Sequence, residues 1–198
     1  MSDYAIEIKN LVKKFDGFTL GPIDLSIPKG TIVGYIGQNG AGKSTTIKLL
    51  LGLLKIDSGE IKILGYDNPN SIELKDKLGV VFDELLVPEE MTLVDLEKFC
   101  SRVYSKWDRD LFYQLKKKFN LSEKKFIKSY SRGMRMKLSM AVALSHNAEI
   151  LILDEATSGL DPIVREEILD FLIDFMQDEN HTILISSHIL SDLEKVAD

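Results

Sequence analysis

Cysteine is almost absent from this 198-residue chain, which contains only Cys100. A single thiol cannot form a disulfide within the chain, and it excludes a zinc site built from several thiolates. Proteins without structural disulfides suit the reducing conditions of the cytosol. We therefore expect a cytosolic protein held together by an ordinary hydrophobic core, which a chain of this length can build.

Long apolar runs and an excess of positive charge are also missing. The longest apolar runs, at 49–54 and 150–153, fall far short of the roughly 20 residues of a membrane-spanning helix. The first ten residues are polar and acidic, unlike a signal peptide, so any membrane role would come through a partner. With 25 Lys and Arg against 31 Asp and Glu, the net charge is -6. That balance argues against a protein whose main task is to grip nucleic acid, which needs a basic surplus.

The sequence does contain a regular alternation of strand and helix patterns. Short apolar or alternating runs predict strands at 4–8, 31–36, 78–82, 150–153 and 181–186. Amphipathic patterns predict helices at 44–54, 92–104, 108–119, 131–144, 161–176 and 189–196. Together they predict one α/β domain with a mostly parallel sheet. Its core would span about 1–83 and 148–198 and would carry a helical subdomain near 84–147.

The strongest single motif is GQNGAGKS at Gly37–Ser44, which lies between a predicted buried strand and a predicted helix. Its spacing fits the phosphate-binding loop G-x-x-x-x-G-K-[ST]. Glycines let backbone N–H groups turn inward around phosphate oxygens, and the helix N-terminus adds partial positive charge. Lys43 would place a full charge on the transferred phosphoryl group, and the Ser44 hydroxyl can ligate Mg²⁺.

A second motif, ILILDE at Ile150–Glu155, supplies the carboxylates that phosphoryl transfer also needs. Four apolar residues predict a buried strand, and its end delivers Asp154 towards the Mg²⁺ site. Glu155 follows directly, and we interpret it as the base or the positioner of an attacking water. A buried strand that merely ends in two solvated acids is the weaker interpretation beside the phosphate loop.

Four motifs together resemble one family. In chain order they are GQNGAGKS, YSRGM at Tyr130–Met134, ILILDEATSGLDP at Ile150–Pro162, and SSH at Ser186–His188. This set resembles the ATP-binding cassette (ABC) ATPase domain over nearly the whole chain. The resemblance implies a P-loop NTPase core with an N-terminal antiparallel β subdomain and an inserted α-helical subdomain. It also implies head-to-tail pairing of two such domains with ATP between them.

The resemblance implies nucleotide-binding roles for a set of positions. They are Phe15, Gly37, Gln38, Asn39, Gly40, Ala41, Gly42, Lys43, Ser44, Thr45, Ser131 and Gly133. Phe15 stands where the family has an aromatic that stacks on adenine, with Phe18 as the fallback and a core role for Phe15 as the alternative. Ser131 and Gly133 match the signature that meets the γ-phosphate of the partner domain, although a plain helix cap also explains Ser131.

Catalytic and metal roles follow from the same resemblance. His188 matches the switch histidine that hydrogen-bonds the γ-phosphate, and it joins Lys43 and Glu155 as the catalytic set. The implied Mg²⁺ ligands are Ser44, Asp154 and Asp83. Asp161 matches an acid that communicates across the dimer, and it is equally a good helix cap.

The sequence departs from the family pattern at three positions. Asp83 occupies the place of the usual glutamine, where it could still meet Mg²⁺ through water, and Glu84 could substitute for it by a one-residue slip. Arg132 replaces the first glycine of the signature, and Ala156 stands where proline is usual. These variants resemble the branch of ABC ATPases that serves separate export permeases.

We therefore expect an ATPase that uses ATP and Mg²⁺ to drive an exporter. The resemblance implies an integral membrane permease as partner, a second cassette that is identical or a paralogue, and a place at the cytoplasmic face of the cell membrane. The family usually continues beyond the position of Asp198, so a truncated chain or an unusually short natural end is expected.

Three other classes fit the sequence less well. A soluble ABC ATPase acting on nucleic acid or ribosomes is the main alternative, but Ser131 follows Ser44 by only 87 residues, which leaves no room for a long coiled coil. A GTP switch would need an Asn-Lys-x-Asp motif, which the chain lacks. A degenerate binding-only protein would not need Asp154, Glu155 and His188.

One basic run stands out against the acidic whole. Its lysines are Lys116, Lys117, Lys118, Lys124, Lys125 and Lys128, with only Glu123 opposing them. A solvated helix face is the preferred interpretation. A surface near anionic lipid or a membrane subunit is the alternative.

Overall fold

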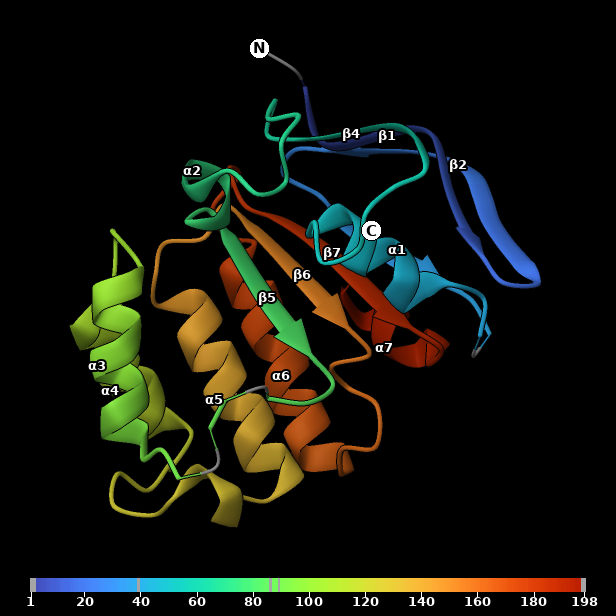
Figure 1. The fold of residues 1–198 in the computed structure, drawn as a ribbon. Helices are drawn as coiled ribbons and strands as arrows, with labels where there is room; N and C mark the ends of the chain where they lie inside the picture. Colours follow the sequence, from blue (N-terminus) through green and yellow to red (C-terminus); the bar gives the residue numbers. More distant parts are fainter. Residues whose placement is uncertain (1–2, 39, 86, 89, 197–198) are drawn as a thin grey trace.

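The computed structural model describes residues 3–38, 40–85, 87–88 and 90–196, and its strands form two sheets (Figure 1). The first is antiparallel, with the order β2–β1–β4, and consists of β1 (Tyr4–Phe15), β2 (Phe18–Pro28) and β4 (Ser58–Ile63). The second is parallel, with the order β3–β7–β6–β5, and consists of β3 (Ile32–Ile36), β5 (Leu78–Phe82), β6 (Ile150–Asp154) and β7 (Thr182–Ser187). The predicted α/β fold is confirmed, including the antiparallel sheet that the family resemblance implied.

The parallel sheet separates two hydrophobic cores. Successive strand residues point to opposite faces of a sheet. On β6, Ile150 and Ile152 join the core beneath the three-stranded sheet and α1 (Lys43–Leu50), whereas Leu151 and Leu153 join the core on the other face. All four side chains are fully buried. A strand covered on both faces needs an uninterrupted apolar run, which is what this segment has.

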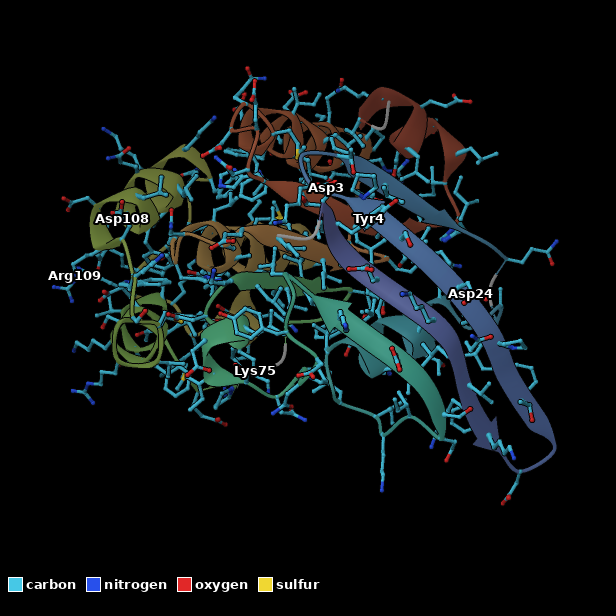
Figure 2. The ribbon with its side chains drawn as sticks, turned by 90° about the horizontal axis from the view of Figure 1, so that it is seen from above. Asp3, Tyr4, Asp24, Lys75, Asp108 and Arg109 are labelled. Atoms are coloured by element: carbon cyan, nitrogen blue, oxygen red, sulfur yellow. The ribbon has the colours of Figure 1, made fainter. Side chains whose placement is uncertain are left out.

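The helices that follow β5 lie mainly on the face of the parallel sheet away from the antiparallel sheet (Figure 1). They are α3 (Leu93–Val103), α4 (Arg109–Lys118), the 3-10 turn Ile127–Ser129, α5 (Arg132–Leu144) and α6 (Pro162–Phe175). Two short helices, α2 (Ile72–Lys75) and α7 (Leu190–Val196), complete the fold. Seen from above, Asp108 and Arg109 at the start of α4 lie on the side of the molecule opposite the β1–β2 hairpin (Figure 2).

A buried carboxylate joins α3 to the segment that leads into α4. Glu97 is fully buried and accepts hydrogen bonds from Trp107 Nε1 at 3.2 Å and from Nε and Nη2 of Arg109, each at 2.9 Å. The Arg109 guanidinium lowers the pKa of Glu97 and keeps it charged. Cys100 lies one turn further along α3, where burial raises its pKa to about 11, so this thiol stays protonated and unreactive.

Two sequence-based boundaries are wrong. The helix expected at 44–54 ends at Leu50, because Gly52 has a φ of +67° and its Cα approaches Asn70 too closely for a Cβ. The strand expected at 4–8 runs on to Phe15, because register shifts around Asn10 (φ +48°) interrupt the alternation without ending the pairing. No helix in the described residues is long and apolar enough to cross a membrane.

Candidate functional site

Strand register brings the carboxyl ends of three parallel strands to one edge of the sheet. Phe82 of β5 pairs with Asp154 of β6, and Asp154 pairs with Ser186 of β7. The residues that follow these strands therefore emerge side by side, beside the loop that follows Ile36 of β3. Ligands of open parallel sheets bind at this edge. The sequence motifs that are separated by more than a hundred residues meet here.

The loop between β3 and α1 has the backbone of an anion cradle. Gly40 and Gly42 have φ values of +82° and +92°, which are unfavourable for residues that have a Cβ. Gly42 also lies against β2, where a Cβ would come within 2.5 Å of Leu20 Cδ1. Gly42 caps α1 without a side-chain hydrogen bond, so the first N–H groups of the helix are left for a ligand. Asn39 lies outside the described residues.

Lys43 is folded into this loop and is 5% exposed. Its ammonium donates to the carbonyl oxygens of Gly37 at 2.6 Å and Gln38 at 3.2 Å, and it lies 3.1 Å from Glu155 Oε1. A buried ammonium needs such partners to offset its desolvation. The loop thus holds a positive charge at its centre, where a phosphate would be bound.

Ser44 and Asp154 form a compact group of oxygen ligands. Ser44 Oγ donates to Asp154 Oδ1 at 3.0 Å, and Ser186 Oγ donates to the same oxygen at 2.7 Å. The Asp154 side chain is 5% exposed. A hydroxyl and a carboxylate at this distance are hard oxygen donors, which fit Mg²⁺ when a substrate phosphate supplies further oxygens. The described residues hold no cluster of three or more His, Cys, Asp or Glu that could bind a metal without such help.

Glu155 is aimed back at the loop by an unusual backbone conformation. Its φ of +52° lies in the left-handed region, which is uncommon for a residue with a side chain. Its N–H donates to Ser186 Oγ at 3.0 Å, which helps to hold this turn. The carboxylate then bridges Lys43 Nζ and His188 Nδ1, the latter at 2.7 Å. Backbone strain held in this way is typical of functional sites.

Asp83 and Glu84 lie at the rim of the same site. With Ser44, Asp154 and Glu155 they line a pocket of about 310 Å³, which also includes Lys48, Leu53 and Phe82. Both acids are exposed. Asp83 thus shares a pocket with the other two expected metal ligands, whereas its role there stays a prediction.

The aromatic pair lies at the turn of the β1–β2 hairpin. Phe15 is 43% exposed and Phe18 is 54% exposed, and their rings stack with centroids 6.5 Å apart. The exposure rules out the alternative in which Phe15 is a core residue. Leu20, two residues beyond Phe18, packs against the phosphate loop at Gly42, so the hairpin and the loop are joined.

Ser131 and Gly133 lie elsewhere in the chain. Ser131 caps α5 by accepting from the N–H of Met134 at 3.2 Å, and Gly133 lets α5 approach Val164 of α6. Asp161 caps α6 in the same way, accepting from Val164 at 3.1 Å. In Figure 1 the start of α5 lies at the lower end of the molecule, apart from the loop that precedes α1. One chain does not bring the signature to its own phosphate loop.

This geometry agrees with the comparison to known families. The model of the family described as ABC transporter matches residues 20–158. The chain belongs to the ABC transporter family. The resemblance read from the four motifs is therefore confirmed.

Named relatives in this family are ATP-binding proteins of transport systems. The bacitracin transport ATP-binding protein BcrA of Enterococcus faecalis is 34% identical over 99% of this chain and 65% of its own length. The lantibiotic transport ATP-binding protein SrtF of Streptococcus pyogenes is 35% identical over 98% of this chain and 84% of its own. A solved ATP-binding subunit of an ABC transporter superposes with a TM-score of 0.84 at 27% identity, covering 98% of this chain and 83% of that one. The chain spans only 65% of BcrA.

Sequence reasoning missed one residue of this ABC site. Ser186 holds both the Asp154 carboxylate and the backbone of Glu155. The SSH motif pointed to its histidine alone. A serine at the end of an apolar run does not by itself indicate a functional hydroxyl. The signal was positional, because the serine ends a buried strand that is parallel to the strand carrying Asp154.

Proposed function

We propose that this chain is the ATP-hydrolysing subunit of an ABC exporter and that it works with a separate membrane permease. The observation that carries the proposal is the position of Glu155, whose carboxylate is held between Lys43 and His188 at the mouth of the phosphate loop. A merely structural acid would not need a left-handed backbone and two cationic or N–H partners. The names of the transport relatives favour the same function.

Each residue then has a chemical task in ATP hydrolysis. Lys43 and the N–H groups of the loop hold the β- and γ-phosphates, since both are hydrogen-bond donors that carry positive charge or partial positive charge. Ser44 and Asp154 would hold Mg²⁺, with Asp83 reaching it through water. When bound, the metal neutralises charge on the β- and γ-phosphate oxygens. Phe15 offers an exposed ring on which adenine can stack.

Glu155 and His188 act on the attacking water. The Glu155 carboxylate accepts the proton of a water positioned in line with the γ-phosphate, as a general base does. His188 donates from Nδ1 to that carboxylate and fixes its orientation. The imidazole would also meet the γ-phosphate, as the family resemblance implies.

Ser131 and Gly133 would serve the nucleotide of a second cassette. Ser131 caps a helix of 13 residues and Gly133 lies in its first turn, where the first N–H groups suit an anion. Because they lie apart from the phosphate loop of the same chain, a head-to-tail pair would bring each signature to the loop of the other chain. The second cassette is identical or a paralogue.

The permease would dock in an apolar groove beside the nucleotide site. This groove of about 460 Å³ is lined by the turn that follows α1, by α2, β5 and the end of α3, and by residues next to them: Leu51, Leu53, Pro69, Ile72, Lys75, Asp76, Leu78, Val80, Phe82, Val103 and Tyr104. Ile72 is 82% exposed and Leu53 is 58% exposed, which is costly for a protein without a partner. Leu53 and Phe82 also line the pocket of Asp83, so a helix bound here would touch the nucleotide site. Such docking would place the chain at the cytoplasmic face of the membrane.

Copurification tests the proposed permease. The tagged chain should bring down a polytopic membrane protein from detergent-solubilised membranes of its own host. Ile72→Asp should reduce that yield at least tenfold, because a charge would be buried in the apolar contact. The matched control is Ile163→Asp on α6, which is 74% exposed and outside the groove. Equal yields for both variants, or no membrane protein in any pull-down, would count against this function.

Asp83 is expected to tune the coupling between permease and hydrolysis. Asp83→Gln should leave ATP binding within about threefold of wild type, since the exposed acid is not part of the cradle. Hydrolysis by the isolated chain should change modestly, and the change should grow when the permease is present. Nucleotide titration and phosphate release measure the two effects. Loss of ATP binding in this variant would identify Asp83 as a direct metal ligand instead.

A further inference from the structure

The basic run that stood out in the sequence is not one helix face. Lys116 and Lys118 are engaged by carboxylates, at 2.5 Å from Glu123 and 3.7 Å from Asp174. Lys117 is an exposed residue of α4, and the other three lysines lie in the segment 121–130 that links α4 to α5. Lys124, Lys125 and Lys128 are exposed there, and no ion pair joins them to a carboxylate of the described residues.

An exposed aromatic ring lies among these three lysines. Phe126 is 50% exposed, and the Lys128 ammonium lies 5.6 Å from the centre of its ring. The neighbouring residue Ile127 is buried, whereas the ring of Phe126 is left at the surface. We call Lys124, Lys125, Phe126 and Lys128 the basic patch. In Figure 1 its segment, coloured yellow, lies at the lower end of the molecule, away from the antiparallel sheet.

The backbone beneath the basic patch is held in place. Tyr130 is buried, and its hydroxyl donates to the carbonyl of Ser122, which closes the segment into a loop. The N–H of Ile127 donates to the carbonyl of Met91 at 2.8 Å, next to a bridge between Thr92 and Phe126. Arg135 donates to the carbonyl of Lys128 at 3.0 Å. The patch is therefore presented as a fixed surface and does not collapse onto the protein.

We propose that the basic patch binds the surface of a bilayer rich in anionic lipids, with Phe126 entering the headgroup region. Clustered lysines beside an apolar residue are attracted to anionic headgroups. Lysine is depleted from protein–protein interfaces, which favour arginine, and here the basic groups are all lysines and one of them lies beside an exposed ring. A bilayer suits that arrangement better than a folded acidic partner.

The position of α3 supports the same assignment. Its start is bridged to the basic patch through Thr92, and its last residue, Val103, lines the groove proposed for the permease. An 11-residue helix is about 16 Å long, so α3 connects the patch to the groove over about that distance. This support rests on the proposed function, whereas the charge and exposure of the patch do not.

Vesicle flotation with the chain alone separates this proposal from the transport function. Wild type should float with vesicles containing about 30% phosphatidylglycerol at about 50 mM salt, and should not float with pure phosphatidylcholine vesicles. Raising the salt to about 300 mM should release it, because exposed charges are then screened. Replacing the three patch lysines by glutamine should weaken binding at least tenfold, and Phe126→Ala should weaken it severalfold.

The matched control removes the same charge elsewhere. Lys9, Lys29 and Lys62 are exposed lysines of the three-stranded sheet or next to it, and their replacement by glutamine should leave flotation unchanged. All substituted side chains are exposed, so equal thermal unfolding of the variants is expected and is measured alongside. Equal losses in patch and control variants overturn the proposal, since net charge alone would explain the binding. Failure of wild type to float overturns it as well and would favour an acidic protein as the partner of the patch.

Discussion

Replacing Lys43 by alanine is expected to reduce ATP hydrolysis to background and to weaken ATP binding roughly tenfold to a hundredfold. The substitution removes the only full positive charge at the centre of the phosphate loop. It also deprives Glu155 of a partner 3.1 Å away, so the carboxylate would be freed from the position in which it faces the substrate. Both effects act on the transition state, because the charge of the phosphoryl group that is being transferred must be stabilised there.

Stability distinguishes this effect from unfolding. Lys43 is buried, and its removal leaves the carbonyl oxygens of Gly37 and Gln38 without their donor, so a fall of a few degrees in melting temperature is expected. Lys55→Ala provides the control, because Lys55 is exposed and lies beyond the end of α1. Nucleotide titration and phosphate release then separate binding from turnover. Near-normal turnover in Lys43→Ala would show that the loop is not part of the active site.

The parts of the fold that sequence predicted best are those governed by one strong pattern. The predicted bounds of the strand at 78–82 are correct, because strands of a parallel sheet that is covered on both faces read as unbroken apolar runs. The helices at 131–144 and 161–176 were placed to within a residue, because Ser131 and Asp161 are capping residues whose side chains accept the expected hydrogen bonds.

The parts that sequence missed depend on distant residues. Strands β2 and β4 have mixed polar faces, and their pairing with β1 becomes visible only when the chain is folded. In the same way, sequence pointed to Glu155 and His188 by motif, but their 2.7 Å contact follows from the parallel register of β6 and β7. Ser186, which holds Asp154 and the backbone of Glu155, could be found only from its position at the end of a strand parallel to the one that carries Asp154.

Glu155→Gln is expected to have the second large effect, and to be the most informative. The amide keeps the size and left-handed position of the side chain, but it cannot take a proton from water. General-base catalysis contributes about a hundredfold to ten-thousandfold, so hydrolysis should fall by at least a hundredfold. ATP binding should persist or tighten, because Lys43 loses a competing carboxylate and the γ-phosphate loses a negative neighbour.

Trapped ATP should then convert monomers into dimers. Each nucleotide would add contacts between the phosphate loop of one chain and Ser131 and Gly133 of the other, and a ligand that binds the dimer more tightly than the monomer shifts the equilibrium towards the dimer by mass action. Light scattering after size exclusion should show the mass doubling with ATP and Mg²⁺. ADP should not cause it, because it lacks the γ-phosphate that the signature is expected to meet.

A double variant, Lys43→Ala with Glu155→Gln, supplies the control for this dimer. It keeps the neutral glutamine but lacks the cradle charge, so it should remain monomeric at ATP concentrations that saturate the single variant. Ser131→Arg with Glu155→Gln should also remain monomeric while still binding ATP. Ser131 is exposed and lies apart from the phosphate loop of its own chain, so the larger side chain would obstruct the contact with the partner and not the chain's own ATP site. A single Glu155→Gln variant that stays monomeric with saturating ATP and Mg²⁺ would contradict the sandwich. Dimerisation of the Ser131→Arg double variant would place the interface away from the signature.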